Sequence, residues 1–269
     1  MVKRELTKTE ISNYAHDLGA ELVGYAPVNR WEEQGDLQPE FYPQRVWPLT
    51  QTVITLAIPS LLPIVETKIS HLYRAQYHNT NSLLDEAAYR LAAFLNRQGQ
   101  ASINICRDGY GVGVLQEKPV AAFSHVWAGY YAGLGTIGWN HTLITREYGP
   151  RHRLVSVLTA LKLPGDPLIT EDLCNKCRLC EKACPNHAFS GEKTAKHSHM
   201  EKFGCAKRRK KFQGPFNHCG FCIKVCPVGN DRKLYHSKNI QKYFSETENF
   251  ANWELGVGAQ IKGWEDQEF

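Results

Sequence analysis

The stretch CNKCRLCEKACP, residues 174–185, decides the fold of the C-terminal part of this chain. Its cysteines follow the spacing C-x2-C-x2-C-x3-C-P, which is the ligand run of bacterial two-cluster iron–sulfur proteins. A second run closes with the same C-x3-C-P, and its cysteines are Cys205, Cys219, Cys222 and Cys226. Because four thiolates hold one [4Fe–4S] cube, the two runs predict two [4Fe–4S] clusters.

The spacing also predicts which cysteines share a cluster. In this pattern the fourth cysteine of each run ligates the other cluster, so the ligand sets are crossed. We expect one cluster on Cys174, Cys177, Cys180 and Cys226, and the other on Cys184, Cys205, Cys219 and Cys222. The two cubes should then lie close enough for electrons to pass between them.

Disulfide bonds and zinc are the alternative explanations of these cysteines. Disulfides are typical of secreted domains, but the residues after Met1 are polar and show no apolar signal segment. Zinc sites use C-x2-C pairs and often a histidine, which leaves the third cysteine and the trailing prolines unexplained. We therefore favour clusters over both alternatives.

Composition bounds the remainder of the chain. At 269 residues and 42% hydrophobic content it is long enough for a sizeable core, and no apolar stretch is long enough to cross a membrane. We expect a cytoplasmic protein without membrane contact. The net charge is only +5, but Lys207–Lys211 is a basic run between two cluster ligands. We interpret it as a solvated loop, with docking of an acidic electron donor or nucleic acid as the alternative.

Hydrophobic periodicity predicts a mixed helix and strand domain ahead of the cysteines. The expected helices are one capped by Thr7 and ending at Gly19, then 82–98 and 125–132; the expected strands are 21–26, 52–58, 101–106 and 154–161. Cys106 is expected to be buried at a strand end. The breaker Pro164-Gly-Asp-Pro167 predicts a domain boundary. The predicted domains are residues 1–166, a two-cluster domain at 167–235 and an acidic extension at 236–269.

A glycine-rich segment at 133–138 matches G-x-G-x-x-G. A dinucleotide site would need a strand before the segment and a helix opening within it, and the surrounding sequence predicts neither. We expect the glycines to let the backbone approach some other flat or bulky ligand.

The glycine-rich segment lies within AGLGTIGWNHTLITREYGP at 132–150, which is followed by an expected strand, a proline break and the paired cysteine runs. In this combination of features the chain resembles epoxyqueuosine reductase. More broadly it resembles the cobalamin-dependent iron–sulfur reductases that include reductive dehalogenases. The likeness covers roughly Tyr73 to Pro227. It implies an α+β architecture, with a nitroreductase-related α/β cofactor domain followed by a ferredoxin-like two-[4Fe–4S] domain. It also implies a cobalamin pocket formed by Gly135, Gly138, Trp139, Asn140, Leu143, Ile144 and Thr145.

The resemblance departs from its family at the proton donor. Pro119 stands where epoxyqueuosine reductases have an acid, so the candidate donors are His125, Tyr130 and Glu117. A hydrogen-bonded core role is the favoured alternative for His125. The resemblance implies a ferredoxin or flavodoxin as electron donor, and a small-molecule or nucleoside substrate. We do not favour tRNA, because the helical repeats that bind it in the family do not follow the cysteines. The alternative function is a non-catalytic electron-transfer protein serving a partner enzyme.

Overall fold

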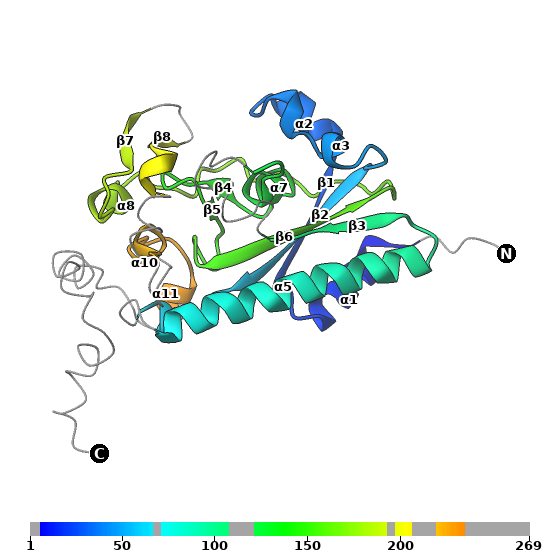
Figure 1. Ribbon diagram of the computed structural model, residues 1–269, viewed down its shortest axis with the longest axis horizontal. Coiled ribbons are helices and arrows are strands. Elements are labelled where there is room, and N and C mark those ends of the chain that lie inside the picture. The colour runs from blue at the N-terminus through cyan, green and yellow to red at the C-terminus, as the bar shows by residue number, and fades with distance from the viewer. Residues whose placement is uncertain (1–5, 67–70, 108–120, 193–196, 206–218, 235–269) are drawn as a thin grey trace, which may run out of the picture.

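The computed structural model describes residues 6–66, 71–107, 121–192, 197–205 and 219–234 (Figure 1). Its helices and strands, in chain order, are α1 (Lys8–Asp17), β1 (Leu22–Pro27), α2 (Asn29–Gln34), η1 (Pro39–Phe41), α3 (Pro43–Val46), β2 (Thr52–Pro59), α4 (Leu62–Val65), α5 (His71–Arg97), β3 (Ser102–Ile105), α7 (His125–Tyr131), β4 (Thr136–Ile137), β5 (Leu143–Ile144), β6 (His152–Thr159), α8 (Leu179–Lys182), β7 (Phe189–Glu192), β8 (Ser198–Met200), α10 (Phe221–Lys224) and α11 (Asp231–Leu234). The described part is therefore a mixed helix and strand fold.

A four-stranded antiparallel sheet with the order β1-β2-β6-β3 forms the centre of the molecule. Ile54 of β2 pairs with Tyr25 on one side and with Val157 of β6 on the other. From Thr52 to Ile58 every residue of β2 is buried. Alternate side chains of a strand point to opposite faces, so burial of all of them means that both faces of the sheet are covered.

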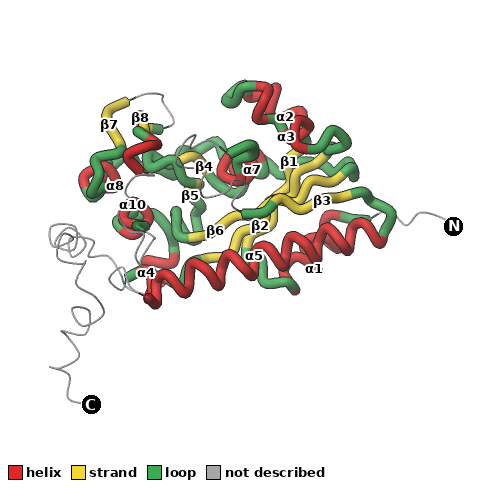
Figure 2. The backbone as a smooth tube through the Cα atoms, in the orientation of Figure 1, coloured by secondary structure: helices red, strands yellow, loops and turns green. Residues whose placement is uncertain are grey.

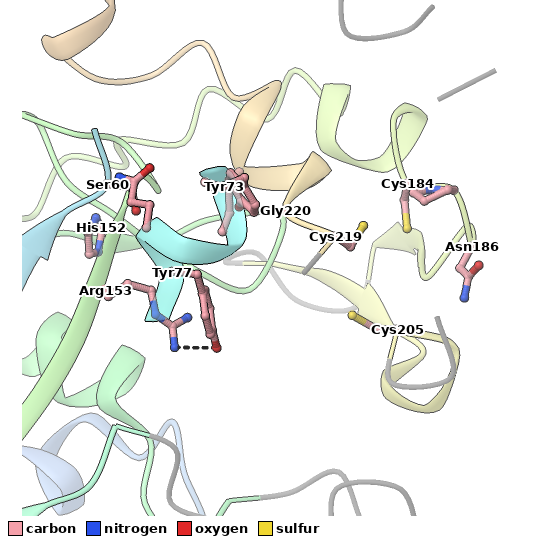
Figure 3. Close-up of a pocket in the computed structure, with 13 residues that line it drawn as sticks. Ser60, Tyr73, Tyr77, His152, Arg153, Cys184, Asn186, Cys205, Cys219 and Gly220 are labelled. Atoms are coloured by element: carbon pink, nitrogen blue, oxygen red, sulfur yellow. Dashed lines mark hydrogen bonds between the residues drawn. The ribbon is translucent and has the colours of Figure 1, made fainter. Parts of the chain in front are cut away.

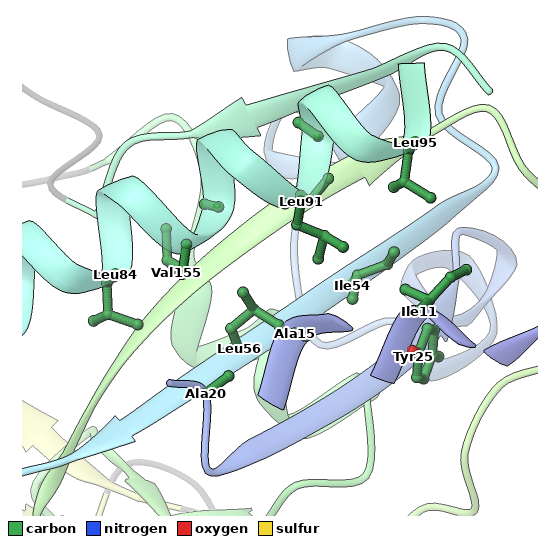
Figure 4. Packing of buried hydrophobic residues seen from close by; sticks show 14 of the residues in the cluster. Ile11, Ala15, Ala20, Tyr25, Ile54, Leu56, Leu84, Leu91, Leu95 and Val155 are labelled. Atoms are coloured by element: carbon green, nitrogen blue, oxygen red, sulfur yellow. The ribbon is translucent and has the colours of Figure 1, made fainter. Parts of the chain in front are cut away.

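Helices α1 and α5 cover one face (Figures 1 and 4). Leu84, Leu91 and Leu95 of α5 lie at helical spacing and pack against Ile54 and Val155 of the sheet. Each of these side chains is fully buried, which stabilises the fold by roughly 1.5–3 kcal/mol per side chain. The helix is held to the sheet by this apolar stripe.

Helix α7 and the segment around α2 cover the opposite face. Trp31 of α2 stacks edge-on against Tyr131 of α7, with ring centroids 4.6 Å apart. Both rings pack with Val53 and Leu158 of the sheet in a second apolar cluster. The sheet is thus the middle of three layers.

The sequence predicted the strands of this sheet to within two residues at each end. It also predicted the start of α1, where the Thr7 hydroxyl accepts the Glu10 N–H and the Glu10 carboxylate accepts the Thr7 N–H. The prediction of α5 was too short, because the helix begins at His71 and its first turns are polar. Leu83 is exposed and Leu84 faces the core, and Cys106 is exposed rather than buried.

The cysteine runs lie in the region after β6, where loops joined by short elements predominate (Figure 2). This region sits at the end of the sheet where α5 and β6 begin (Figure 1). Within the part of the chain that the structure describes, no helix has the length and apolarity needed to cross a membrane.

Candidate functional site

The thiols of the first predicted ligand set lie together. Burial and the nearby thiols of Cys226, Cys174 and Cys177 raise the pKa of the Cys180 thiol to about 12. Cys226 comes from the second run, so the neighbourhood supports the crossed arrangement that the spacing predicts. A thiol with so high a pKa is protonated when no metal is bound, and a metal displaces that proton when it binds.

The second predicted set has the same character. Burial raises the pKa of the Cys222 thiol well above its ordinary value, and Cys219, Cys205, Cys180 and Cys184 raise it too. Three of these neighbours belong to the second set, and Cys180 belongs to the first. The two sets therefore adjoin each other.

The sulfurs leave room for something larger than one ion. Among the described residues, no three Cys, His, Asp or Glu side chains converge on a point where a single metal ion would contact all of them. In Figure 3 the sulfurs of Cys184, Cys205 and Cys219 stand apart around a common space. A cube fits such a site because each of its four irons takes a different thiolate.

The two runs bend their backbones in the same way. Arg178 and Gly220 are left-handed, with φ of +58° and +61°, and each is followed by a short helix, α8 or α10. Their surroundings differ. The Arg178 guanidinium lies over the Trp139 ring, whereas a Cβ at Gly220 would stand 2.0 Å from the Tyr73 hydroxyl. A side chain at the second position would have to displace the ring of Tyr73.

Backbone amides donate hydrogen bonds to two of the sulfurs. The Trp139 N–H lies 3.4 Å from the Cys174 Sγ, and the Ala188 N–H lies 3.3 Å from the Cys184 Sγ. Hydrogen bonds to sulfur are among the factors that set the reduction potential of a cluster. Each predicted cluster would therefore receive at least one such bond.

The glycines of the 133–138 segment face the protein itself. A Cβ at Gly135 would lie 2.2 Å from the Ile144 carbonyl oxygen, and one at Gly138 would lie 2.7 Å from the Ile144 side chain. Both contacts arise because β4 and β5 form a tight hairpin. Close packing of this hairpin already requires both glycines, so their presence does not identify a ligand pocket.

Trp139 and Asn140, at the tip of the hairpin, contact the cysteine region. The Trp139 indole packs with Cys180 and donates from Nε1 to the Glu181 carboxylate at 2.9 Å. The Asn140 amide donates to the Cys222 carbonyl oxygen at 3.2 Å. These two residues therefore join the sheet domain to both cysteine runs.

The remaining predicted pocket residues are Leu143, Ile144 and Thr145, and all three are buried. Leu143 lines a cavity of about 310 Å³ together with His125, Val126 and Arg153. Ile144 and Thr145 do not line this cavity. Of the predicted cobalamin residues, only Leu143 reaches it.

His125 lines the same cavity, but both of its ring nitrogens have partners. Nδ1 lies 2.9 Å from the Ser156 hydroxyl, and Nε2 lies 3.1 Å from the Cys106 carbonyl oxygen. A carbonyl only accepts, so Nε2 donates and Nδ1 accepts from Ser156 in the neutral ring. This geometry favours the hydrogen-bonded core role that the sequence offered as the alternative for His125.

The other two candidate donors lie elsewhere. Tyr130 lines a separate cavity of about 130 Å³ with Thr136 and Asp172, and its ring packs against Trp127 and Tyr131. Glu117 and the basic run at 207–211 lie outside the described residues. The structure therefore places His125 and Tyr130 in different cavities.

A second cavity of about 260 Å³ lies beside the second set of cysteines. Cys184, Cys205 and Cys219 line it, together with residues of α5 and the start of β6 (Figure 3). It shares the side chains of Tyr77, His152, Arg153 and Ile223 with the 310 Å³ cavity. The space beside these cysteines and the space beneath α7 are therefore separated only by this shared wall.

Sequence reasoning missed the residue that ties the two regions together. Arg151 is completely buried and donates to both carboxylate oxygens of Asp231 at 2.6 Å. It also donates to the carbonyl oxygens of Cys226 and Val228. From the sequence we expected Arg151 to form a surface salt bridge, with binding of an anionic tail as the alternative. Arg151 is buried instead, and its partner lies 80 residues away, where no local pattern predicts it.

His152, Gln76 and Tyr73 were also missed as lining residues, whereas Arg153 was expected to form a surface salt bridge, with binding of an anionic tail as the alternative. For Gln76 and Tyr73 the signal was weak, because the helix was expected to begin only at Ser82.

Comparison with known proteins supports the cysteine assignment. Residues 173–230 match the family described as "4Fe-4S dicluster domain". A tetrachloroethene reductive dehalogenase from Desulfitobacterium hafniense is 29% identical over 225 residues, which cover 77% of this chain and 36% of that protein. An epoxyqueuosine reductase from Listeria monocytogenes is 22% identical, over 87% of this chain and 68% of the relative. The chain thus spans about a third of the length of the dehalogenase.

Solved structures show the same likeness in fold. The catabolic reductive dehalogenase NpRdhA superposes with a TM-score of 0.67 at 22% identity, over 93% of this chain and 37% of that one. An epoxyqueuosine reductase from Streptococcus thermophilus superposes with a TM-score of 0.57 at 20% identity, over 82% and 65% of the two chains. In sequence and in fold, this chain is similar to the epoxyqueuosine reductases and reductive dehalogenases, and it carries their kind of 4Fe-4S dicluster domain.

Proposed function

We propose that this chain is an iron–sulfur reductase that uses two [4Fe–4S] clusters and a corrinoid to reduce an organic substrate. The observation that carries the proposal is the wall shared by the two cavities. Through it the cavity lined by the second set of cysteines adjoins a cavity of about 310 Å³, which is within the range of ligand sites. Similarity to reductases and to a protein studied for B12-dependent dehalogenation supports it.

The cysteines of the two crossed sets would hold the clusters, which supply one-electron transfer when bound. Cys177 of the first set is exposed, whereas the cysteines of the second set are all only partly exposed. An external donor such as a ferredoxin or flavodoxin would therefore meet the first set. The second set faces the cavities.

The 310 Å³ cavity beneath α7 is the place for a corrinoid or the part of it that reacts, which supplies a low-valent cobalt for reduction when bound. Leu143 and Val126 give this cavity apolar surface, while Arg107 and Arg153 give it hydrogen-bond donors. Its size is at the small end for a ligand site, and residues 108–120, which join two of its lining segments, lie outside the described part. We also propose that the domain built around the sheet is related to nitroreductase-like domains. The boundary between this domain and the two-cluster domain would lie near Pro164.

The test is titration of anaerobically purified, corrinoid-free protein with cobalamin, followed by its visible spectrum. Ala121 lines the cavity and is half-buried, whereas its neighbour Ala122 is exposed. Ala121→Trp should fill the cavity and weaken binding at least tenfold, and Ala122→Trp should bind like the wild type. Iron content checks that each variant is folded.

Two outcomes would contradict the proposal. If the wild type binds no cobalamin while carrying full iron, the electron-transfer protein becomes the better interpretation. If both tryptophan variants bind normally, the corrinoid sits in another place. Substitutions at Gly135 do not serve here, because any side chain would strike Ile144.

A further inference from the structure

The cavity beside the second cysteine set is lined by buried polar groups that the fold does not satisfy. We call the side chains of Ser60, Gln76, Tyr77, His152 and Arg153 the polar wall; all five line the cavity beside the second cysteine set. In Figure 3 Tyr77, His152 and Arg153 stand at one end of this cavity, and the cysteines stand at the other. The polar wall therefore lies at the end of this cavity away from the predicted cluster ligands.

Gln76 is the least satisfied member. It is only 8% exposed, and neither its Oε1 nor its Nε2 has a hydrogen-bond partner. A buried polar group without a partner costs about 1–3 kcal/mol, so such groups are rare and call for an explanation. The amide offers one donor and one acceptor to whatever enters the cavity.

His152 presents a second unsatisfied atom. Its side chain is 7% exposed, and Nδ1 has no partner. Burial together with the charge of Arg153 lowers the pKa of His152 to about 4. The ring is therefore neutral near pH 7. In the neutral ring each nitrogen either donates or accepts, so Nδ1 is a hydrogen-bonding atom without a partner.

Arg153 brings a fixed positive charge to the same wall. Its Nε donates to the Asn81 side-chain oxygen at 2.9 Å, and one terminal nitrogen donates to the Tyr77 hydroxyl at 3.1 Å. The guanidinium also lies over the Tyr77 ring. Among the described residues that line the two cavities, none is Asp or Glu. Arg153 therefore gives the polar wall a positive charge with which a carboxylate can pair.

We propose that the polar wall binds a small carboxylate that carries a neighbouring hydroxyl group. The carboxylate would accept from Arg153 and from the Gln76 amide, and the hydroxyl would hydrogen-bond with His152 Nδ1. The inference rests on the proposed function, since it names the substrate class of the same reductase. It accounts for the charge of Arg153, for the unpartnered Nδ1 of His152 and for the donor of Gln76 together.

Three probes separate these interactions. The experiment is calorimetric titration of the anaerobically purified, cluster-loaded and corrinoid-free protein with lactate, propionate and lactamide. Lactate offers both groups, propionate lacks the hydroxyl, and lactamide lacks the charge. We expect lactate to bind at least tenfold more tightly than either of the others. Bound lactate should also alter the paramagnetic resonance spectrum of the reduced protein, because the polar wall lines the same cavity as Cys184, Cys205 and Cys219.

Variants test each atom of the wall. Gln76→Glu keeps the shape of the side chain and adds a negative charge, so it should weaken lactate binding at least tenfold. His152→Phe should make lactate and propionate bind alike. Arg153→Met should abolish binding of both acids. The matched control is Arg146→Met, because Arg146 is half-exposed and pairs with Glu171 away from the cavities.

Several results would overturn the inference. The first is that lactate does not bind, and the second is that lactamide binds as tightly as lactate. The third is that Arg146→Met and Arg153→Met lose lactate affinity equally. The first would mean that water alone fills the polar wall. The second would mean that the polar wall binds neutral amides, such as the side arms of a corrinoid. Failure of the cobalamin titration with lactate binding intact would refute the proposed function and leave this inference standing.

Discussion

The buried pair of Arg151 and Asp231 should stabilise the union of the sheet and the cysteine region. The perturbation is Asp231→Asn, which keeps the size of the side chain and removes its charge. Arg151 would then remain completely buried with two carbonyl partners and no opposite charge from Asp231. Removing one partner of a buried ion pair typically costs about 3–5 kcal/mol.

The matched control is Glu171→Gln. Glu171 pairs with Arg146 at 2.9 Å, but the two side chains are 66% and 49% exposed. An exposed pair contributes about 0–1 kcal/mol, so the control should be close to the wild type. The same chemical change is thus made once in the interior and once at the surface.

The assay is urea unfolding of the cluster-loaded protein without air, followed by visible absorbance and circular dichroism on the same samples. With a dependence of about 3 kcal/mol per molar urea, Asp231→Asn should lower the midpoint by about 1–2 M. Because cluster loss is irreversible, all samples are compared after one fixed time. The double variant Arg151→Met with Asp231→Leu should recover much of the loss, since it buries no charge.

A midpoint for Asp231→Asn within about 0.2 M of Glu171→Gln would refute this reasoning. It would mean that the carbonyl partners of Arg151 are sufficient without the carboxylate. Failure of the double variant to recover would refute the electrostatic account alone, and would leave the packing of the two side chains as the source of stability.

Three further predictions can be checked separately. Protein purified without air should hold about eight iron and eight acid-labile sulfide ions, and Cys226→Ser should damage the cluster of the first run more than that of its own; four irons, or two zincs, would contradict this. His152 has a pKa of about 4 when folded and 6.5 as its ordinary value, so the unfolded chain binds a proton first as the pH falls; between pH 7 and pH 5 the wild type should lose about 2 kcal/mol relative to His152→Asn, and parallel unfolding curves would contradict it. Reversing the charges of Lys207–Lys211 should slow reduction by an acidic donor and weaken its salt dependence, whereas an unchanged rate would return the run to a solvated loop.

Much of the fold follows from local patterns in the sequence. The strands were predictable because β2 and β6 are uninterrupted apolar runs, and α1 was predictable because Thr7 and Glu10 form a complete capping box. The 4Fe-4S dicluster domain was predictable because the spacing of its cysteines is typical of two-cluster proteins. Each of these patterns spans only a few neighbouring residues, so it can be recognised in the sequence without knowledge of the tertiary structure.

The site could not be predicted in the same way. Gly135 and Gly138 read as a ligand signal, but the requirement for glycine comes from Ile144 across a hairpin. The predicted beginning of α5 was wrong because polar residues such as Gln76 face a cavity that only the folded chain creates. Contacts of this kind join segments that are distant in the sequence. The pattern of residues within either segment therefore does not predict them.

The difference between Arg178 and Gly220 makes the two copies of the duplicated motif unequal. Two copies of one backbone turn would, by themselves, give two clusters the same surroundings. One copy carries a charged side chain near the exposed Cys177, and in the other the Tyr73 hydroxyl lies where a side chain would stand. Since net charge and solvent exposure help to set cluster potentials, the two clusters should differ in reduction potential, and that difference sets the favoured direction of electron transfer between them.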